Sequence, residues 1–413
     1  MNGSPMRNSL CFFLSALLLA SCATSSDFEI KDYSTILKSL SLSAKQGDAQ
    51  AQANLGVMYA NGLGVRQDYA EAATWYSKAA VQGNSVAQFN LGVLYYKGLG
   101  VSQDYAEAAK WFSLAANRGD VKAQSNLGFI YEKGQGVAQD SKEAAKWFRM
   151  ASVKGDVEAQ SHLGVLYLKG TGVPQDYKEA LWWLRSAAEQ GEVNAQYNLG
   201  TIYEKGQGVP QDYPEAAKWY RKAGYQGNAQ AQHNLGIMYY NGLGVPQDFA
   251  EAATWFRMAA DRGDTLAQST IGFMYDSGQG VTQNYAEAER WYRKAAEQGD
   301  SVAQYNLGLM YVKGHGFEED YGEAAKWYRM AADKGHAQAQ YYLGLMYCEG
   351  NGVPRDPVQG YLWLSLAAEQ GIDAAGQHLD VLAEDMAPDK IAQAQEMVRS
   401  WVRQNQKIRD SRS

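Results

Sequence analysis

The chain has 413 residues and a formal net charge of −7; 46% of its residues are hydrophobic and 20% are charged, a composition typical of folded protein. The acidic balance, without a stripe of basic residues, excludes nucleic acid as an expected partner. Glycine is frequent (42) and proline scarce (8), which indicates many turns at regular intervals.

The N-terminus has the features of an export signal. Arg7 precedes an apolar run from Leu10 to Ala20, which is too short to span a bilayer and fits a signal peptide. The motif LASC that ends at Cys22 resembles the lipobox of bacterial lipoproteins, in which the cysteine carries the lipid. We therefore expect residues 1–21 to be a lipoprotein signal peptide and Cys22 to be the lipidation site, at the start of a tether formed by residues 22–32.

The lipobox resemblance also implies a location. Two or three acyl chains anchor a protein stably to a membrane. Ala23 follows the cysteine, at the position where aspartate is the usual signal for inner-membrane retention in Gram-negative lipoproteins. We expect a cell-envelope protein, lipid-anchored in the outer membrane and facing the periplasm. The alternative is an ordinary signal followed by a chance cysteine. Cys348 would be the one thiol left after processing and lipidation, so no internal disulfide is expected.

A period of 36 residues organises the rest of the chain. Tryptophan marks it at nine positions: Trp75, Trp111, Trp147, Trp183, Trp219, Trp255, Trp291, Trp327 and Trp363. Such self-similarity predicts a repeat architecture. The expected segments are a half-repeat cap at 33–47, nine repeats at 48–83, 84–119, 120–155, 156–191, 192–227, 228–263, 264–299, 300–335 and 336–371, a C-terminal helical cap at 372–404 and a polar tail at 405–413.

Each repeat is predicted to hold two helices, here named A and B. In the first repeat Asp48 is the expected N-cap of helix A, whose residues Ala51, Leu55 and Met58 form one apolar stripe. Gly56 adjoins this stripe in every repeat. Because glycine inside a helix costs about 1 kcal/mol against alanine, its recurrence indicates that a neighbouring helix approaches closely.

Helix B opens with a second capping signal. Asp68 and Glu71 have the spacing of a capping box. Ala72, Trp75 and Ala79 form the predicted buried stripe, so the nine tryptophans are interpreted as core rather than as a ladder that stacks sugars or bases.

The Gly-x-Gly before each helix B is interpreted as a turn. Gly62-Leu63-Gly64 superficially resembles a phosphate-binding loop. A dinucleotide fingerprint requires a preceding strand and a third glycine, and a P-loop requires Gly-Lys-Ser/Thr. Neither is present.

The repeat closely resembles a known family. The segment AQYNLGTIYEKGQGVPQDYPEAAKWYRKA, Ala195 to Ala223, is similar to the Sel1-like repeat, a relative of the tetratricopeptide repeat, and the likeness covers Asp48 to Gly371. The resemblance implies an all-α fold: an α/α solenoid in which nine helix pairs form a right-handed superhelix, with terminal caps, that acts chiefly by binding other molecules. Before the repeats, Leu37 and Leu40 are expected to cover the first one. After them we expect one more helix A, at residues 372–386, and a closing helix from Pro388 to about Trp401.

No catalytic or metal site is predicted. The five histidines share no cluster, the recurrent carboxylates already have capping roles, and no cofactor is expected. Some cysteine-rich Sel1-like proteins have been described as penicillin-binding or β-lactamase enzymes, but this chain lacks their paired cysteines and any Ser-x-x-Lys. An envelope enzyme acting on peptidoglycan or β-lactams remains the alternative to a non-catalytic interaction scaffold.

The binding face is predicted from variation between repeats. We number positions by the first repeat, so that register 53 comprises residues 53, 89, 125 and their equivalents. Registers 51, 55, 58 and 59 should face the core, whereas registers 53, 57 and 60 lie on the other side. Register 57 is mostly apolar and is expected to pack partly between repeats, so registers 53 and 60 are the ones expected to be exposed. In Sel1-like folds helix A lines the concave side, so a groove is expected there, holding a protein or a glycan. The alternative is neutral drift on a solvated surface. The candidate residues are Phe89, Tyr96, Glu132, Tyr197, Glu204, His233, Tyr240, Asp276, Tyr305 and Tyr341.

Overall fold

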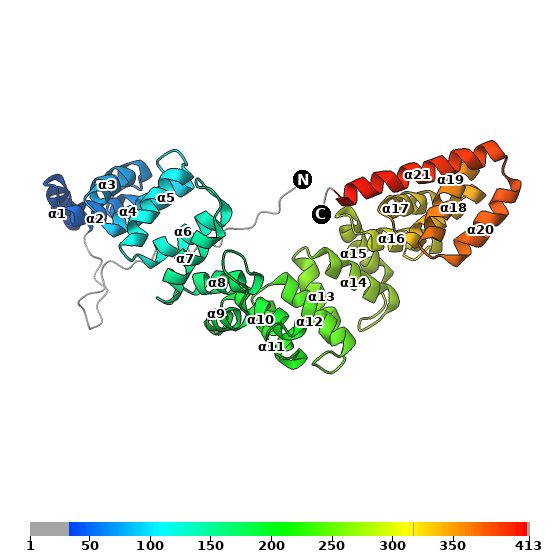
Figure 1. Ribbon diagram of the computed structural model, residues 1–413, viewed down its shortest axis with the longest axis horizontal. Coiled ribbons are helices and arrows are strands. Elements are labelled where there is room, and N and C mark those ends of the chain that lie inside the picture. The colour runs from blue at the N-terminus through cyan, green and yellow to red at the C-terminus, as the bar shows by residue number, and fades with distance from the viewer. Residues whose placement is uncertain (1–32, 317, 411–413) are drawn as a thin grey trace. The chain divides into compact units, whose positions relative to one another are not determined.

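The structure is a computed structural model that describes residues 33–316 and 318–410. The predicted signal peptide, the lipidation site Cys22 and the tether lie outside these residues. Within them, every regular element is an α-helix, and 21 helices follow one another along the chain (Figure 1). None of the helices in these two ranges is both long enough and apolar enough to cross a membrane.

The helices alternate between the predicted A and B positions. The A helices are α2 Ala49–Asn61, α4 Ser85–Lys97, α6 Val121–Lys133, α8 Val157–Lys169, α10 Val193–Lys205, α12 Ala229–Asn241, α14 Thr265–Ser277, α16 Ser301–Lys313, α18 Ala337–Glu349 and α20 Asp373–Asp385. The B helices are α3 Tyr69–Val81, α5 Tyr105–Asn117, α7 Ser141–Ser152, α9 Tyr177–Glu189, α11 Tyr213–Tyr225, α13 Phe249–Asp261, α15 Tyr285–Glu297, α17 Tyr321–Asp333 and α19 Pro357–Glu369. Helices α1, Tyr33–Lys45, and α21, Pro388–Asp410, flank them.

The chain divides into two compact units, Met1–Leu199 and Gly200–Ser413, which we describe separately. In each unit a helix A packs on the helix B of its own repeat, and that helix B packs on the next helix A. A helices of neighbouring repeats (α2 with α4, α6 with α8, α14 with α16) approach each other more closely than B helices do. Each unit is therefore a stack of helix pairs with its A helices on the inner side, which confirms the predicted α/α solenoid.

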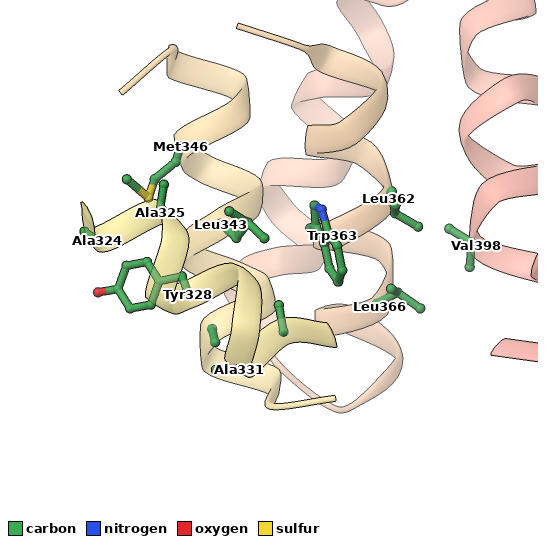
Figure 2. Packing of buried hydrophobic residues seen from close by; sticks show 12 residues of the cluster. Ala324, Ala325, Tyr328, Ala331, Leu343, Met346, Leu362, Trp363, Leu366 and Val398 are labelled. Carbon is green, nitrogen blue, oxygen red and sulfur yellow. The ribbon is translucent and has the colours of Figure 1, made fainter. Parts of the chain in front are cut away.

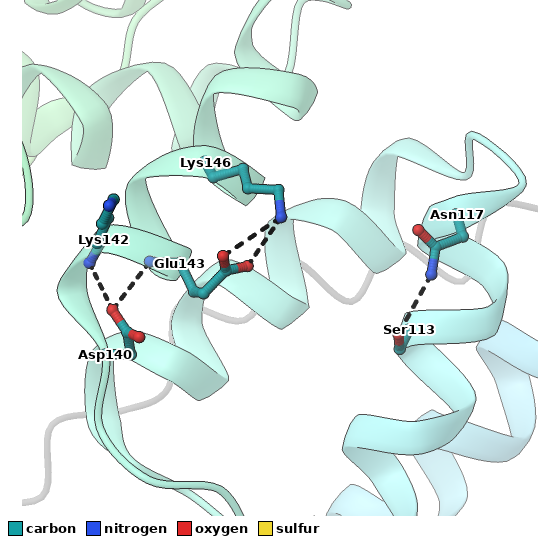
Figure 3. Close-up of polar contacts among 6 residues, drawn as sticks. All are labelled: Ser113, Asn117, Asp140, Lys142, Glu143 and Lys146. Atoms are coloured by element: carbon teal, nitrogen blue, oxygen red, sulfur yellow. Dashed lines mark hydrogen bonds and ion pairs between the residues drawn. The ribbon is translucent and has the colours of Figure 1, made fainter.

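The aspartates before the B helices act as N-caps, as predicted. In Figure 3, Asp140 accepts hydrogen bonds from the backbone N–H groups of Lys142 (2.9 Å) and Glu143 (3.1 Å). The reciprocal bond of a capping box is not needed, because the N–H of Asp140 donates to the carbonyl of Tyr131 at 3.0 Å. Glu143 instead pairs with Lys146 at 3.1 Å. The cap therefore also joins helix B to the helix A before it.

The core confirms the predicted stripes and adds a register. Ala51, Leu55 and Met58 and their equivalents are buried. In helix B the most deeply buried large side chain is at register 76, one residue after the tryptophan, as in Phe112 and Phe148. Trp75 and Trp111 are only half-buried. In the first repeats the buried stripe of helix B therefore lies one residue later than the stripe predicted from the sequence.

The recurrent glycine of helix A is explained by this register. A Cβ placed on Gly92 would lie 2.8 Å from the ring of Phe112, closer than side chains pack. The ring of helix B thus rests directly on the backbone of helix A, which confirms the predicted close approach.

A buried glutamine joins each repeat to the helix B before it. Gln88 donates through Nε2 to the carbonyl of Ala80 at 3.0 Å, and Gln124 donates to Ala116 in the same way. The equivalent bond is present in all nine repeats. The carbonyls at the ends of helices lack partners within the helix, so each glutamine satisfies one of them across a junction.

The Gly-x-Gly turn serves packing between repeats. Gly62 and Gly64 have positive φ angles of 68° and 71°, which glycine adopts without strain. A Cβ on Gly100, equivalent to Gly64, would overlap the backbone of Tyr69 in the preceding repeat. The turn thus contacts the start of the preceding helix B.

The terminal helices close the stack. Leu37 and Leu40 of α1 pack against the cluster of Ala51 and Leu55. At the other end α21 covers α19 (Figure 2). The sequence predicts an end near Trp401, but α21 continues to Asp410, because no glycine or proline interrupts this polar segment.

Candidate binding surfaces on the A helices

The ten residues predicted to line an exposed groove are half-buried instead. At register 53, Ala53, Ser125 and Ser269 are even fully buried. A helix in this stack packs against its own helix B and against both neighbouring repeats, so more than one of its faces is covered. The prediction that registers 53 and 60 are exposed is therefore wrong.

In unit 1 the predicted residues contact adjacent helices. The ring of Phe89 lies 5.7 Å from that of Phe112. The hydroxyl of Tyr96 donates to Gln135 Oε1 at 2.8 Å across to the next repeat. Tyr197 is half-buried on α10.

Glu132 is the charged member of this set in unit 1. His162 Nδ1 lies 3.4 Å from its Oε2, an electrostatic contact longer than a usual hydrogen bond. Burial acts to raise the pKa of Glu132, but the neighbouring His162, with Lys133 and Lys169, outweighs it and holds that pKa below its ordinary value. This carboxylate is therefore ionised at neutral pH, with its Oε2 buried beside His162.

In unit 2 two predicted residues, Tyr240 and His233, link repeats through polar contacts. Tyr240 donates to Gln279 Oε1 at 2.8 Å. His233 Nδ1 lies 3.1 Å from Asp264. Burial acts to raise the pKa of Asp264, yet the contact with His233 and the backbone N–H of Ala267 hold it below its ordinary value.

Two acidic predicted residues of unit 2 have neighbouring partners of their own. Glu204 accepts a hydrogen bond from the hydroxyl of Tyr220, and Asp276 lies 3.8 Å from His315 Nδ1. Burial and the bond to Glu204 raise the pKa of Tyr220, so its hydroxyl remains a donor.

The last two predicted residues belong to an aromatic cluster. Tyr305 stacks on His336 with centroids 4.8 Å apart and lies 6.1 Å from Tyr342. Tyr341 lies 5.2 Å from Tyr342 and 5.8 Å from His378. Tyr342, which sequence reasoning did not select, is the most exposed tyrosine of this cluster.

The solvated face of helix A lies at registers 50, 54, 57 and 61, which we name the inner row. These registers are spaced i, i+4, i+7 and i+11 and so lie on one side of a helix. Along the row register 54 is asparagine in six of nine repeats, and register 61 is lysine in five. That recurrence is visible in the sequence, but variation between repeats does not select it.

In unit 1 the inner row is rich in amides and lysines. Asn90 and Asn126 are half-buried at register 54 and make no side-chain hydrogen bond among the residues that the structure describes. Lys97, Lys133 and Lys169 follow at register 61 and are exposed. An amide offers both a donor and an acceptor, so this face can bind a peptide backbone beside acidic groups.

In unit 2 the inner row keeps amides and lysines, such as Asn234 and Lys313, and adds exposed apolar side chains. Leu266 and Val302 at register 50 are 59% and 49% exposed, and Phe273 and Ile237 at register 57 are 43% and 37% exposed. Apolar side chains left in water in a continuous series mark interaction sites. Unit 1 has one such side chain on this row, Val86 at 39%, so exposed apolar residues are more frequent on the inner row of unit 2.

The described residues offer little for metal binding or nucleophilic chemistry. No group of three or more His, Cys, Asp or Glu residues that could hold a metal ion occurs in residues 33–316 and 318–410. Burial and the charge of Glu349 raise the pKa of Cys348 to about 11, so this thiol is protonated at neutral pH and is a poor nucleophile. A depression of about 520 Å³ lies beside Arg66, Asp68 and Gly100, away from the inner row.

Comparison with known proteins explains this arrangement. The family model of the Sel1 repeat matches nine consecutive segments: residues 49–84, 85–120, 121–156, 157–192, 193–228, 229–264, 265–300, 301–336 and 337–372. The chain belongs to the Sel1 repeat family. Each matched Sel1 segment begins one residue after the start predicted from the 36-residue period.

Two solved structures are similar over most of the chain. A protective antigen present in uropathogenic Escherichia coli strains, which displays an SLR fold, is 32% identical; the match covers 89% of this chain and 94% of that one, with a TM-score of 0.53. A Sel1 repeat protein from Oxalobacter formigenes is 30% identical, with coverage of 88% and 98% and a TM-score of 0.54. No match was found among curated protein sequences.

Family membership defines the broad class of function. Sel1 repeat proteins generally act as scaffolds for protein–protein interaction, and their solenoid is typically not an enzyme. A protein partner is therefore the expected ligand class.

Proposed function

We propose that this Sel1 repeat protein is a non-catalytic scaffold of the bacterial cell envelope that binds a partner protein along the inner row of its A helices. The observation that carries the proposal is the exposed apolar series of unit 2, Ile237, Leu266, Phe273 and Val302. Leu266 and Val302 occupy register 50, where other repeats have polar residues such as Gln50. Ile237 and Phe273 occupy register 57, which is apolar in every repeat except at Thr201.

The ten residues selected from the sequence keep a supporting role in this proposal. Their contacts across junctions, such as that between Tyr240 and Gln279, fix the spacing of neighbouring A helices. Binding sites on rigid elements are held more accurately than sites on loops. A protein partner would therefore meet a preformed surface.

The test exchanges residues between equivalent registers, so that folding is preserved. Leu266→Gln, Phe273→Thr and Val302→Gln introduce the residue types that other repeats carry at those registers, namely Gln50, Thr201 and Gln338. Crosslinking of the full chain in its native envelope should capture a protein, and the triple variant should lose that species.

A matched control makes the result specific. Tyr225→Asp with Met330→Lys also removes exposed apolar side chains, but from B helices, and uses residues found at the same registers in other repeats. This control should retain the captured protein. Retention by the inner-row variant would refute the proposed surface, and capture of peptidoglycan without a protein would refute the proposed partner.

The envelope location rests on the N-terminal motif. Cys22→Ser should leave the protein unprocessed or release it from membranes, because the acyl chains would be missing. Membrane fractionation with acyl labelling measures this. A wild-type chain that fractionates without label as a soluble protein would refute the lipid anchor.

A further inference from the structure

The outer faces of the B helices follow a simple rule. At register 74 seven of the nine repeats carry a polar residue: Thr74, Lys110, Lys146, Lys218, Thr254, Arg290 and Lys326. Polar residues are expected there because this side of helix B faces water. The two exceptions are Leu362 in α19 and Trp182 in α9.

The first exception is explained within the chain. Helix α21 covers the outer face of α19, and Val398 points at Leu362 and Leu366 (Figure 2). Leu362 and Leu366, at registers 74 and 78, are consequently only 5% and 2% exposed. Trp401 of α21 adds an edge contact to Trp363, with centroids 6.4 Å apart. The outer registers of helix B are thus apolar where a helix packs on them.

The second exception has no such cover among the described residues. Trp182 is 62% exposed. Its ring lies edge-on to that of Trp183, with centroids 4.2 Å apart, and this contact holds the Trp182 ring in place. The preceding B helices add Leu114 and Met150 at register 78 and Val153 at register 81, all exposed. We name Leu114, Met150, Val153 and Trp182 the outer patch.

Basic side chains border the outer patch on two sides. Lys110 and Lys146 lie at register 74, and Arg118 and Lys154 lie at register 82; all four are exposed. The first two pair with Glu107 and Glu143 in their own helices. Exposed pairs of this kind are weak, so the border favours an acidic partner.

We infer that the outer patch of α5, α7 and α9 binds an amphipathic helix of a partner protein, with an apolar stripe over Trp182 and acidic residues beside the lysines. Helix α21 on α19 is the example of this packing within the same chain. Neighbouring helices pack roughly 10 Å apart. The B helices of successive repeats do not pack directly on one another and lie further apart than that, so a helix that crosses α5, α7 and α9 spans more than roughly 20 Å and takes more than about 13 residues. This surface is separate from the inner row, so the two sites are tested independently.

The probe is a labelled 23-residue peptide with the sequence of α21 in which Arg399 and Arg403 are replaced by glutamate. It carries the apolar stripe that packs on α19, with acidic flanks. In the full chain, helix α21 already covers α19. Binding of the added peptide therefore reports on a different surface, which we expect to be the outer patch. Fluorescence anisotropy measures its affinity, and circular dichroism measures its helicity when bound.

The variants again use residues found at the same register in other repeats. Trp182→Lys and Leu114→Lys match Lys218 and Lys78, and each should weaken peptide binding at least tenfold with little change in melting temperature. Trp182→Thr, which matches Thr74, replaces the first variant if it folds poorly. Tyr225→Asp, which removes an exposed aromatic from unit 2, should leave the affinity unchanged.

Three results would overturn the inference. Equal affinity of the peptide for the wild type and Trp182→Lys would show that the patch does not bind helices. Sedimentation with vesicles of anionic lipid that is lost in Trp182→Lys, without peptide binding, would indicate a membrane surface instead. A wild-type dimer in analytical ultracentrifugation that becomes monomeric in Trp182→Lys would indicate self-association.

Discussion

At the scale of single residues, the glycine of helix A shows how tightly each repeat is packed. Its absence of a side chain lets an aromatic ring of helix B lie on the helix backbone, as Phe112 does on Gly92. The intrinsic cost of glycine in a helix, about 1 kcal/mol, is offset by burial of that ring. The sequence revealed the position through recurrence, and the packing shows the cause.

We expect Gly92→Ala to destabilise unit 1 by about 1–3 kcal/mol, because the added methyl group forces Phe112 out of its position. Urea denaturation measures the change. Gly376→Ala is the control, since a Cβ there meets nothing within 4 Å. The control should stabilise by about 0.5–1 kcal/mol through helix propensity. Equal effects of the two substitutions would show that the ring does not rest on the backbone.

At the scale of helices, junctions between repeats differ in one hydrogen bond. Some repeats carry a second glutamine 30 positions after the buried one. The Nε2 of this second glutamine donates to Oε1 of the buried glutamine, as Gln82 does to Gln52 at 2.8 Å. Among the described residues, four of these junction glutamines have a buried Oε1 without a partner: Gln88, Gln124, Gln232 and Gln304. In these four the later residue is an arginine or a lysine: Arg118, Lys154, Arg262 and Lys334. Side-chain identity therefore decides whether a junction is fully bonded.

Arg118→Gln should supply the missing donor to Gln88 and stabilise unit 1 by about 0.5–1.5 kcal/mol, the usual worth of a neutral hydrogen bond. The midpoint of urea denaturation measures it. Arg118→Ala removes the same charge without adding a donor and should give no such gain. A gain of equal size in both variants would attribute the effect to charge rather than to the bond.

The helices were predictable from sequence, whereas their contacts with other repeats were only partly so. Period, caps and the stripe of Ala51, Leu55 and Met58 follow from the spacing along one helix. The burial of Phe89 and Tyr96 does not, because it depends on contacts with other elements: Phe89 with Phe112 of helix B, and Tyr96 with Gln135 of the next repeat. Residue spacing along a single helix predicts one buried face. A helix inside the stack has several buried faces, because it contacts several neighbours. The exposed inner row appears only once the stack is known.

At the scale of the whole molecule, stability should follow the repeat count. Each repeat buries its apolar faces only against neighbours, and every junction uses the same glutamine bond, as Gln268 makes to Ala260. Removal of residues 264–299, one period, rejoins equivalent residues and should preserve helicity per residue. Removal of residues 264–281 should expose an apolar stripe and lower the helicity.

Circular dichroism and binding of a hydrophobic dye distinguish these two deletions. The one-period deletion should behave as a shorter folded chain, and the half-period deletion should bind dye. Similar damage from both would contradict a modular solenoid, because it would show that the removed repeat has contacts beyond its neighbours.

The uniform junction has an evolutionary consequence. Each helix B ends in a carbonyl that accepts a hydrogen bond from Nε2 of the next glutamine, so this bond can form whichever repeat follows. Duplication or loss of one period of coding DNA therefore regenerates a sound junction at the point of recombination. The copied segment brings its own solvent-facing residues. Its residues at the junction registers remain compatible with those of the neighbouring repeats. Such a gene can gain or lose binding chemistry in whole units, and selection acts on the surface of each new copy rather than on its ability to fold.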